Sequence, residues 1–468
     1  MINASIPSVI ANHPPPATCS ILITAVNARY SHSSYAARTL KANMHDLEEG
    51  CSILEADLSI TPIQLASQII ELAPKIAVFS TYIWNVRIIE TTARILQVTA
   101  PNIKRIAGGP ELTADYNNAK LFDLCIIGEG ETALRESCRK MLKEPQAALP
   151  QIIEAPPENT DALQPPFLLY SKDDLKHRVI YVEASRGCPY HCSYCTSSGT
   201  GLRLMPLTTL LPELDKLWQR GLRKFKFLDR SFTAAIAHAN AIMRFFLERC
   251  EPEMYLHFEI NTDHLQKETA QMLAKFPPGA LHLECGIQTL NPKVALTAGR
   301  APNAARTLEN LKFLTAQTGA IVHADLIFGL PGEDEASFAA GFNKLITTCH
   351  PPEVQVNLLK GLPGTELVKN AETFKLKFSP EPPYELLQSD CMDFKTLMRI
   401  QRFARCWELI HNRGRFKDEV KQLNSQSKDL YNMWTRLTEL IFSEEGRMFR
   451  IGTARLKKYL DDFIGDGM

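Results

Sequence analysis

The sequence predicts an α/β protein with a doubly wound N-terminal domain, a partial (β/α)6 barrel and an α-helical C-terminal domain. Three features of the 468-residue chain lead to this prediction. Two series of short apolar runs alternate with helical patterns, a proline-rich segment separates the series, and the alternation stops near residue 376. Short strands that are apolar throughout are typical of parallel sheets covered on both faces. A chain of this length has room for two or three domains.

The first series predicts a flavodoxin-like domain over residues 19–147, because five strand-like runs alternate with helical patterns. Before it, residues 1–18 include the run Pro14–Pro16 and are expected to form a disordered leader. After it, residues 148–176 hold two Pro-Pro pairs and are expected to form a linker. We expect the strands at 20–26, 51–56, 75–80, 103–108 and 122–127, and the helices near 33–48, 62–72, 86–99 and 131–143.

The second series predicts a partial barrel over residues 177–375, since six βα units are too few for a closed barrel of eight. The carboxyl ends of its strands are expected to form the active face. Residues 376–468 are expected to form the helical C-terminal domain. The barrel strands are expected at 179–185, 224–229, 255–260, 281–287, 322–328 and 353–359, with helices that include 212–221 and 235–250, and the C-terminal helices near 393–412, 416–425 and 428–445.

The composition restricts the classes of partner and compartment. Lys+Arg and Asp+Glu number 52 each, so the overall charge favours neither nucleic acid nor an anionic membrane. No apolar run reaches the roughly 20 residues that a spanning helix needs, and the N-terminus is a poor signal peptide. Most of the twelve cysteines stand singly in apolar segments. Reduced, buried cysteines predict a cytoplasmic protein.

Three cysteines stand apart in the segment EASRGCPYHCSYCTSS (183–198), directly after the first barrel strand. Cys188, Cys192 and Cys195 give the pattern Cys-x-x-x-Cys-x-x-Cys, for which this cysteine content predicts roughly 0.008 chance matches. Three thiolates from one loop can hold three irons of a 4Fe–4S cluster and leave the fourth iron open to a chelating amine and carboxylate. A structural zinc site is the alternative, with His191 as the fourth ligand.

The triad, with the aromatic Tyr194 before its last cysteine, resembles the radical SAM superfamily. The resemblance covers about residues 179–370. It implies that the cluster gives one electron to S-adenosylmethionine and that the resulting 5′-deoxyadenosyl radical abstracts a substrate hydrogen. It also implies an external reductant such as flavodoxin or ferredoxin.

Several positions of this chain match the SAM-binding motifs of that superfamily. Glu259 in FEINTD (258–263) would take a ribose hydroxyl or the methionyl amine, or is an exposed strand carboxylate. Gln288 in GIQTLNP (286–292) would contact SAM or the cluster side, or caps the strand end. The backbone of Tyr194 would contact adenine, and Arg300 follows the Gln288 motif. Gly329 and Gly332 in DLIFGLPGE (325–333) would let the backbone approach adenine, as would the turn LLKGLPGT (358–365).

The second barrel strand departs from this pattern. Where a glycine-rich GGE-type sequence is common, this chain reads KFLDRSF (226–232). We interpret Asp229 and Arg230 as candidate catalytic residues that bind SAM or substrate, with a simple pairing of the two as the equal alternative.

The N-terminal domain resembles the cobalamin-binding domain of cobalamin-dependent radical SAM enzymes. In many cobalamin proteins, the histidine of an Asp-x-His-x-x-Gly loop coordinates the cobalt from below. That loop is absent after the first strand of this chain, which reads VNARYSHSSYAAR (26–38). His32 has the wrong spacing for that motif, and Asn27, Arg29 and His32 could line a cofactor or substrate cleft instead. The resemblance implies contacts to cobalamin from strand ends and glycine-rich turns: Asn27, Ser80, Thr81, Gly108, Gly109, Gly128, Glu129 and Glu131.

The order of motifs resembles an uncharacterised bacterial branch whose C-terminal region is a domain of unknown function. The expected function is therefore a cobalamin-dependent radical SAM enzyme, with methyl transfer or another radical reaction on a small molecule, a peptide or RNA. The alternatives are a tRNA methylthiotransferase-like modifier and a non-enzymatic iron–sulfur or cobalamin sensor. In the tail, Arg399, Arg402, Arg405 and Trp407 form a basic helical stripe. This stripe is interpreted as a solvated face or as an RNA-binding face. The helical tail as a whole is interpreted as a cover for the barrel mouth, which would keep water away from the radical.

Overall fold

The computed structural model describes residues 19–146, 148–300 and 303–465. The expected leader, residues 1–18, lies outside this part of the chain. The chain divides into two compact units, which are described separately. The first contains the residues up to Ala184 together with Arg203–Lys226, and the second contains Ser185–Leu202 and the residues from Phe227 onward. The unit boundary therefore falls a few residues after the predicted start of the barrel at 177.

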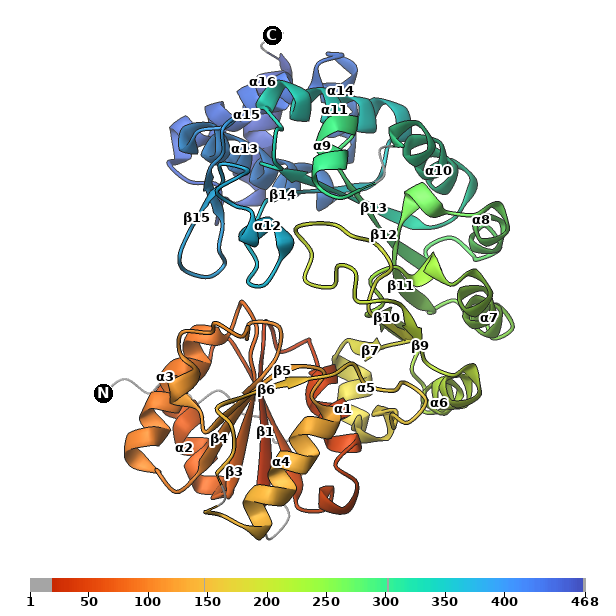
Figure 1. The fold of residues 1–468 in the computed structure, drawn as a ribbon. Coiled ribbons are helices and arrows are strands. Elements are labelled where there is room, and N and C mark those ends of the chain that lie inside the picture. Colours follow the sequence, from red (N-terminus) through yellow and green to blue (C-terminus); the bar gives the residue numbers. More distant parts are fainter. Residues whose placement is uncertain (1–18, 147, 301–302, 466–468) are drawn as a thin grey trace. The chain divides into compact units, whose positions relative to one another are not determined.

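The N-terminal sheet is parallel throughout, in the order β2-β1-β3-β4-β5-β6 (Figure 1). This order confirms the flavodoxin-like prediction, with the reversal of strand order between β1 and β3. Its strands are β1 (Ile21–Asn27), β2 (Cys51–Asp57), β3 (Ile76–Ser80), β4 (Lys104–Gly108), β5 (Leu124–Gly128) and β6 (Ile152–Ala155).

Helices cover both faces of this sheet. The core on one face joins Leu22 and Phe79 to α2 and α3, and the core on the other joins Ile23 and Val78 to α1 and α4. Alternate residues of one strand thus enter two different cores, as the pleat of a strand requires. The helices are α1 (Tyr35–Ala42), α2 (Pro62–Leu72), α3 (Val86–Thr99) and α4 (Glu131–Lys143), with the short η1 (His45–Leu47) and η2 (Ala119–Leu121).

The segment 148–176 is more than the linker that its prolines indicate. It contributes β6 to the sheet, followed by η3 (Phe167–Leu169) and α5 (Lys172–His177). Ser171 and Asp174 form a capping box at the start of α5. The buried Asp174 also pairs with Arg38 at 3.1 Å, and Arg38 pairs with Glu55 at 2.8 Å. These buried contacts, which lie far apart in the sequence, fasten the segment to the first unit.

The second sheet has the order β14-β13-β12-β11-β10-β7, and its strands match the six predicted ones. Strands β11 to β14 pair in parallel, and α7, α8 and α10 lie along one face of this part (Figure 1). This confirms the partial barrel. Its strands are β7 (Ile180–Val182), β10 (Lys224–Phe227), β11 (Tyr255–Ile260), β12 (Leu281–Gln288), β13 (Ile321–Phe328) and β14 (Glu353–Leu358).

The intervening elements of this half follow the predicted rhythm. Asn291, Asn303 and Asp334 cap α9, α10 and α11 with their side chains. The elements are β8 (Ser185–Arg186), β9 (Arg203–Leu204), α6 (Leu207–Gln219), η4 (Phe232–Ala234), α7 (Ile236–Leu247), η5 (Thr262–His264), α8 (Lys267–Leu273), α9 (Pro292–Thr297), α10 (Ala304–Gln317), α11 (Glu335–Cys349) and α12 (Glu366–Lys369).

The C-terminal region is helical, as predicted, and it covers the edge strand β14. Helix α13 packs on β14. The Asn412 side chain accepts from the Val354 amide at 3.0 Å and donates to the Val354 carbonyl at 2.8 Å. An exposed edge strand invites pairing with other chains, so this contact protects it. The elements are β15 (Lys377–Phe378), β16 (Leu386–Gln388), α13 (Phe394–Trp407), the π-helix η6 (Glu408–Asn412), α14 (Lys417–Ser425), α15 (Leu430–Glu445) and α16 (Thr453–Gly465).

Candidate functional site

The loop that carries the three cysteines is fastened within the second unit by its backbone. The amide of Ser193 donates to the Ala298 carbonyl at 3.0 Å, and the Ser193 carbonyl accepts from Leu367 at 2.8 Å. Gly299 has φ of +73°, and a Cβ there would lie 2.2 Å from the His191 carbonyl oxygen. Glycine is therefore required at 299 by the close approach of the two backbones. The loop has a defined path that does not depend on a ligand.

The three thiols gather on this loop and form no disulfide. Cys188 is buried, and Cys192 and Cys195 are half-buried. Burial raises the pKa of Cys188, the two neighbouring thiols raise it further, and Arg230 lowers it. This electrostatic coupling places all four side chains in one neighbourhood. His191, the fourth ligand of the zinc alternative, is exposed, and its ring lies against Gly199. Three free thiols from one loop suit a cluster with one open iron.

Arg300 connects the cysteine loop to two strand ends. Its guanidinium donates to Cys192 Sγ at 3.9 Å and to the Tyr194 hydroxyl at 3.4 Å. It also donates to Asp263 at 3.3 Å, after β11, and to the Gly286 carbonyl at 2.8 Å, in β12. A cation at this position offsets the negative charge that thiolate ligands bring. The structure therefore brings Tyr194, Cys192 and Arg300 together, as the motif positions predict.

Gln288 ends β12 in a strained conformation. Its φ is +67°, which is uncommon for a residue other than glycine, and the pairing with β13 shifts register between Gly286 and Gln288. The Gln288 Oε1 atom is buried and has no hydrogen-bond partner among the described residues. A bulge that aims a buried acceptor without a partner fits a ligand better than the strand-end cap.

The remaining predicted residues of this half lie at the same strand ends. Asp229 is buried and accepts from the Ser185 hydroxyl at 2.5 Å, whereas the Arg230 side chain is exposed. Glu259 is half-buried in β11 and lies close enough to raise the pKa of Asp325, together with Glu284 and after the larger effect of burial. The predicted roles of Asp229, Arg230 and Glu259 remain proposals.

Different physical features explain why glycine occupies positions 329 and 332, after β13. Both have positive φ, +87° at Gly329 and +77° at Gly332. A Cβ at Gly329 would lie 2.5 Å from Leu386 Cδ2, whereas a Cβ at Gly332 would meet nothing within 4 Å. Packing against Leu386 alone accounts for glycine at 329. Gly332 leaves open space beside the turn, which is the feature that an approaching ligand needs.

In the first unit, the predicted cobalamin contacts lie at the carboxyl edge of the sheet. Asn27 ends β1 and donates to Glu55 and to the His32 carbonyl, both at 3.0 Å. Ser80 ends β3, and the buried Oγ1 of the following Thr81 has no hydrogen-bond partner in the part of the chain that the structure describes. Ligands of such sheets bind at this edge, at the reversal between β1 and β3. These residues fit a cofactor site at that position.

The glycine turns of this edge serve internal packing to a large extent. A Cβ at Gly109 would lie 2.3 Å from the Thr81 carbonyl oxygen, and one at Gly128 would lie 2.6 Å from that of Ala155. At Gly108 the nearest atom, the Ile126 carbonyl oxygen, is 3.6 Å away. Close approach of neighbouring loops therefore explains Gly109 and Gly128, and of the three only Gly108 leaves room on its exposed side.

The two glutamates near α4 also have partners within the first unit. Glu129 pairs with Arg203 and accepts from the Glu158 amide at 2.9 Å. Glu131 is buried in the first turn of α4. The N-terminus of α4 is satisfied by Glu158, whose carboxylate accepts from the Thr132 amide at 2.7 Å. Cofactor contact by Glu129 would have to compete with these internal bonds.

His32 is held by a side chain of its own unit. Its Nδ1 lies 2.5 Å from the Tyr181 hydroxyl, and the two rings stack. Burial is the largest cause that lowers the pKa of His32, which keeps the ring neutral near pH 7. A His32 ring held in this way by Tyr181 favours a structural role in the loop over contact with a ligand.

Sequence reasoning missed three side chains at these edges. Tyr82 and Trp84 follow β3 and stack with ring centroids 4.4 Å apart, and Trp84 is 44% exposed. Asp263 holds Arg300 in place. The apolar run that marks β3 ends in TYIW, so an aromatic pair just beyond a strand was the available signal for Tyr82 and Trp84.

The basic stripe of α13 is used for contacts within the second unit, to α11 and to the C-terminal helices. Arg399 pairs with Glu335, Arg402 pairs with Glu439 at 2.9 Å, and Arg405 donates to the Met448 carbonyl at 3.3 Å. Trp407 is fully buried. Charges paired in this way favour a structural face over an RNA-binding one.

Among the described residues, no helix is both long and apolar enough to cross a membrane.

Family models identify three parts of the chain. The radical SAM superfamily model matches residues 182–344, the B12 binding domain model matches residues 21–137, and the model for a protein of unknown function, DUF4080, matches residues 372–464. The chain therefore has a radical SAM domain, a B12-binding domain and a DUF4080 C-terminal region. The first family implies a 4Fe–4S cluster and S-adenosylmethionine, and the second implies cobalamin.

Curated relatives are methyltransferases by name. The cobalamin-dependent radical SAM methyltransferase TokK of Streptomyces tokunonensis is 24% identical over 365 residues, which are 69% of this chain and 53% of that protein. The bacteriochlorophyllide d C-12(1)-methyltransferase of Chlorobaculum tepidum is 24% identical over 56% of this chain and 58% of its own length. The chain thus spans about half the length of these relatives.

Solved structures show the same fold at low identity. The cobalamin-dependent S-adenosylmethionine radical enzyme OxsB, solved with aqua-cobalamin and S-adenosylmethionine, superposes with a TM-score of 0.63 at 12% identity, over 96% of this chain and 84% of that one. The radical S-adenosylmethionine methyltransferase TsrM of Kitasatospora setae gives 0.60 at 16% identity, over 78% of each chain. This likeness confirms the fold class.

Proposed function

We propose that this chain is a cobalamin-dependent radical SAM methyltransferase. The observation that carries the proposal is the fixed loop with three free thiols and Arg300 beside Cys192, in a chain that also has a B12-binding domain. The names of the curated relatives support methyl transfer. The substrate class stays open among a small molecule, a peptide and RNA, and a flavodoxin or ferredoxin is the proposed reductant.

Cys188, Cys192 and Cys195 would hold the cluster, and the edge with Asn27, Thr81 and Gly108 would hold cobalamin, with Tyr82 and Trp84 as an added aromatic face. When bound, the cluster supplies the electron that cleaves S-adenosylmethionine, and cobalamin supplies a methyl group. Arg300 offsets the charge of the thiolates and fixes the position of Tyr194. Gln288 offers its buried oxygen to an amine or hydroxyl of the nucleoside.

The methylthiotransferase alternative needs three further N-terminal cysteines that share one cluster. Cys51 and Cys125 are fully buried in the sheet, where burial raises their pKa values to about 12 and about 11. Cys125 and Cys19 belong to the core on one face of the sheet, and Cys51 belongs to the core on the other face. A single cluster cannot bind thiols on both faces, so the structure disfavours this alternative.

The test of methyl transfer is the recovery of methylcobalamin. The anaerobically reconstituted full chain would be loaded with hydroxocobalamin, reduced, and supplied with S-adenosylmethionine labelled in its methyl group. We expect labelled methylcobalamin and S-adenosylhomocysteine without any added substrate. Cobalamin that elutes freely in gel filtration, or that stays unlabelled, would overturn the methyltransferase proposal. A sensor would bind the cofactors but would not turn them over.

A further inference from the structure

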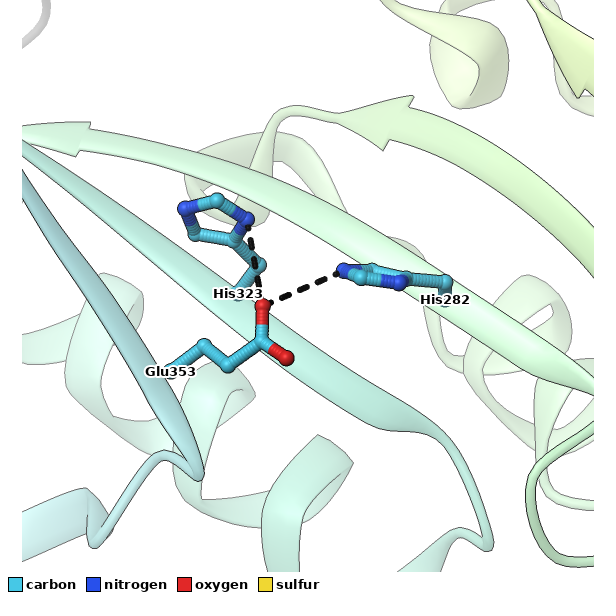
Figure 2. Close-up of side chains that lie close together, drawn as sticks. All are labelled: His282, His323 and Glu353. Carbon is cyan, nitrogen blue, oxygen red and sulfur yellow. Dashed lines mark ion pairs between the residues drawn. The ribbon is translucent and has the colours of Figure 1, made fainter. Parts of the chain in front are cut away.

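Two histidines and a glutamate meet at the amino-terminal end of the second sheet. His282 is the second residue of β12, His323 the third of β13 and Glu353 the first of β14 (Figure 2). Along β12, His282 and Glu284 alternate with the buried Leu281 and Leu283, which places them on the opposite face of the strand. In the register of the sheet, His323 lies directly beside Glu284 of β12 on one side and Glu353 of β14 on the other.

This cluster is remote from the cysteine loop. Gln288 ends β12 on the side of the cysteine loop, and it lies six residue steps along the strand from His282. At the rise of a β-strand, this separation is about 20 Å. The group is therefore not part of the site described above, although both lie in the same unit.

The distances in this group suit a shared metal better than direct bonds. His282 Nε2 and His323 Nδ1 each lie 3.6 Å from Glu353 Oε2. A contact of that length is too long for a hydrogen bond. Two ligands of a tetrahedral zinc ion at about 2.1 Å lie about 3.4 Å apart. All three ligand atoms lie within 4.8 Å of one another, so small side-chain movements would complete the coordination.

The other nitrogen of His282 already has a positioning partner, and a carboxylate lies near the other nitrogen of His323. The Tyr255 hydroxyl lies 2.7 Å from His282 Nδ1, and Asp325 Oδ1 lies 3.5 Å from His323 Nε2. Histidines that bind metals typically donate their second nitrogen to a carboxylate or another acceptor, which fixes the ring. The bond to Tyr255 thus holds Nε2 of His282 toward Glu353, and a small movement of the His323 ring would bring its Nε2 within bonding distance of Asp325.

The surroundings favour a cation and allow it to enter. Glu284, Asp325 and Glu353 lie on adjacent positions of this face, and His257 contacts Glu284 at 3.1 Å. The side chains of His282 and His323 are each 17% exposed, and that of Glu353 is 32% exposed. A divalent ion would offset the negative charge that these carboxylates bring together.

We propose that His282, His323 and Glu353 bind one divalent transition-metal ion that joins strands β12, β13 and β14. Two imidazoles and one carboxylate form a ligand set that both Zn²⁺ and Fe²⁺ use, with one or more positions left to water. The site is independent of the proposed methyl transfer. A direct ion pair between protonated histidines and Glu353 is the competing explanation, and it binds no metal.

The test uses the full chain with Cys188, Cys192 and Cys195 all changed to Ala, which removes the loop thiols that would bind zinc or iron. After treatment with a chelator, equilibrium dialysis against Zn²⁺ or Co²⁺ should show one equivalent bound per chain. The visible spectrum of bound Co²⁺ should show nitrogen and oxygen ligands without a thiolate charge-transfer band. Adding Glu353→Gln or His323→Ala should lower the affinity by more than about 100-fold, and Tyr255→Phe by about 10-fold.

The control is His350→Asn at an exposed histidine with φ of +46°, where asparagine is well tolerated. It should leave the affinity unchanged. If the triple alanine chain does not fold, the rise in unfolding temperature on adding Zn²⁺ is measured with the cluster-loaded chain and with its Glu353→Gln variant. Absence of stoichiometric binding, or equal binding by the Glu353→Gln variant, would overturn the proposal.

Discussion

The carboxyl edges of the two sheets differ in how their polar groups are satisfied. At the edge of the first sheet, Glu129 pairs with Arg203, and neighbouring backbone explains Gly109 and Gly128. At the edge of the second sheet, Gln288 is strained and its oxygen has no partner among the described residues, and Arg300 reaches a thiol. The first edge also has a buried hydroxyl without a partner among the described residues, at Thr81, but the second edge combines such a group with backbone strain and a cation beside a thiol, so ligand binding has the stronger structural support there.

The largest expected effect is loss of the cluster from the second edge. Cys192→Ala removes one of three ligands, so anaerobic reconstitution should give chain with background iron and without the visible absorbance of a 4Fe–4S cluster. Iron and sulfide analysis measures this. The matched control is Cys250→Ala, at an exposed cysteine of the same unit, which should bind a full cluster. Full cluster absorbance in Cys192→Ala would refute the ligand set.

A second prediction concerns Glu333, in the turn after β13. Burial raises its pKa from 4.5 to about 8, and among the described residues only one of its oxygens has a hydrogen-bond partner, Thr289 at 2.7 Å. Between these values the folded chain binds more protons than the unfolded chain, so stability falls as the pH rises. The loss of stability over this pH range is on the order of 5 kcal/mol.

Glu333→Gln stays neutral and should remove this part of the pH dependence. The unfolding midpoint in urea, measured near pH 5 and near pH 8, should therefore change less in the variant than in the natural chain. Parallel pH dependence in the two proteins would show that Glu333 ionises freely and that this edge is better solvated than the burial of Glu333 indicates.

Gln288→Ala should weaken binding of S-adenosylmethionine by about 10-fold to 100-fold while the cluster remains intact. The loss follows from the buried Oε1, which bonds no other described residue. Equilibrium binding to the cluster-loaded chain measures it. Unchanged affinity would indicate that Gln288 only caps the end of its strand. The evidence for ligand binding would then be no stronger at the second edge than at the first.

The smallest effect is expected at the first edge. Thr81→Val removes a buried hydroxyl at the end of β3 and should reduce retention of cobalamin by about threefold to tenfold. Thr24→Val is the matched control, because the buried Thr24 hydroxyl also bonds no residue in the described part of the chain but lies inside β1. Equal effects of the two changes would indicate a general loss of stability and no contact at Thr81.

The sequence predicts most elements because apolar periodicity decides strands and helices. The helices α2, α3 and α4 begin and end where the pattern indicates. The segment 148–176 was harder, because β6 is only four residues long and its place depends on pairing with β5. Likewise, the Asp174 contact with Arg38 spans 136 residues, which no local pattern reveals.

The candidate site could be predicted where one segment supplies the chemistry. Cys188, Cys192 and Cys195 share a loop, so their spacing is informative by itself. The group His282, His323 and Glu353 comes from three strands, and only the register of the sheet brings it together. The role of a glycine is also hard to predict from sequence. A glycine that leaves space for a ligand looks the same in the sequence as one that leaves space for a neighbouring carbonyl group, as Gly109 does.

The most direct test of the central claim is the formation of 5′-deoxyadenosine by the anaerobically reconstituted full chain. With S-adenosylmethionine and a strong one-electron reductant, the natural chain should produce 5′-deoxyadenosine and the Cys192→Ala chain should produce none. Equal background levels from the two proteins, in samples where the natural chain has its full iron and sulfide content, would contradict the assignment of these cysteines to radical chemistry.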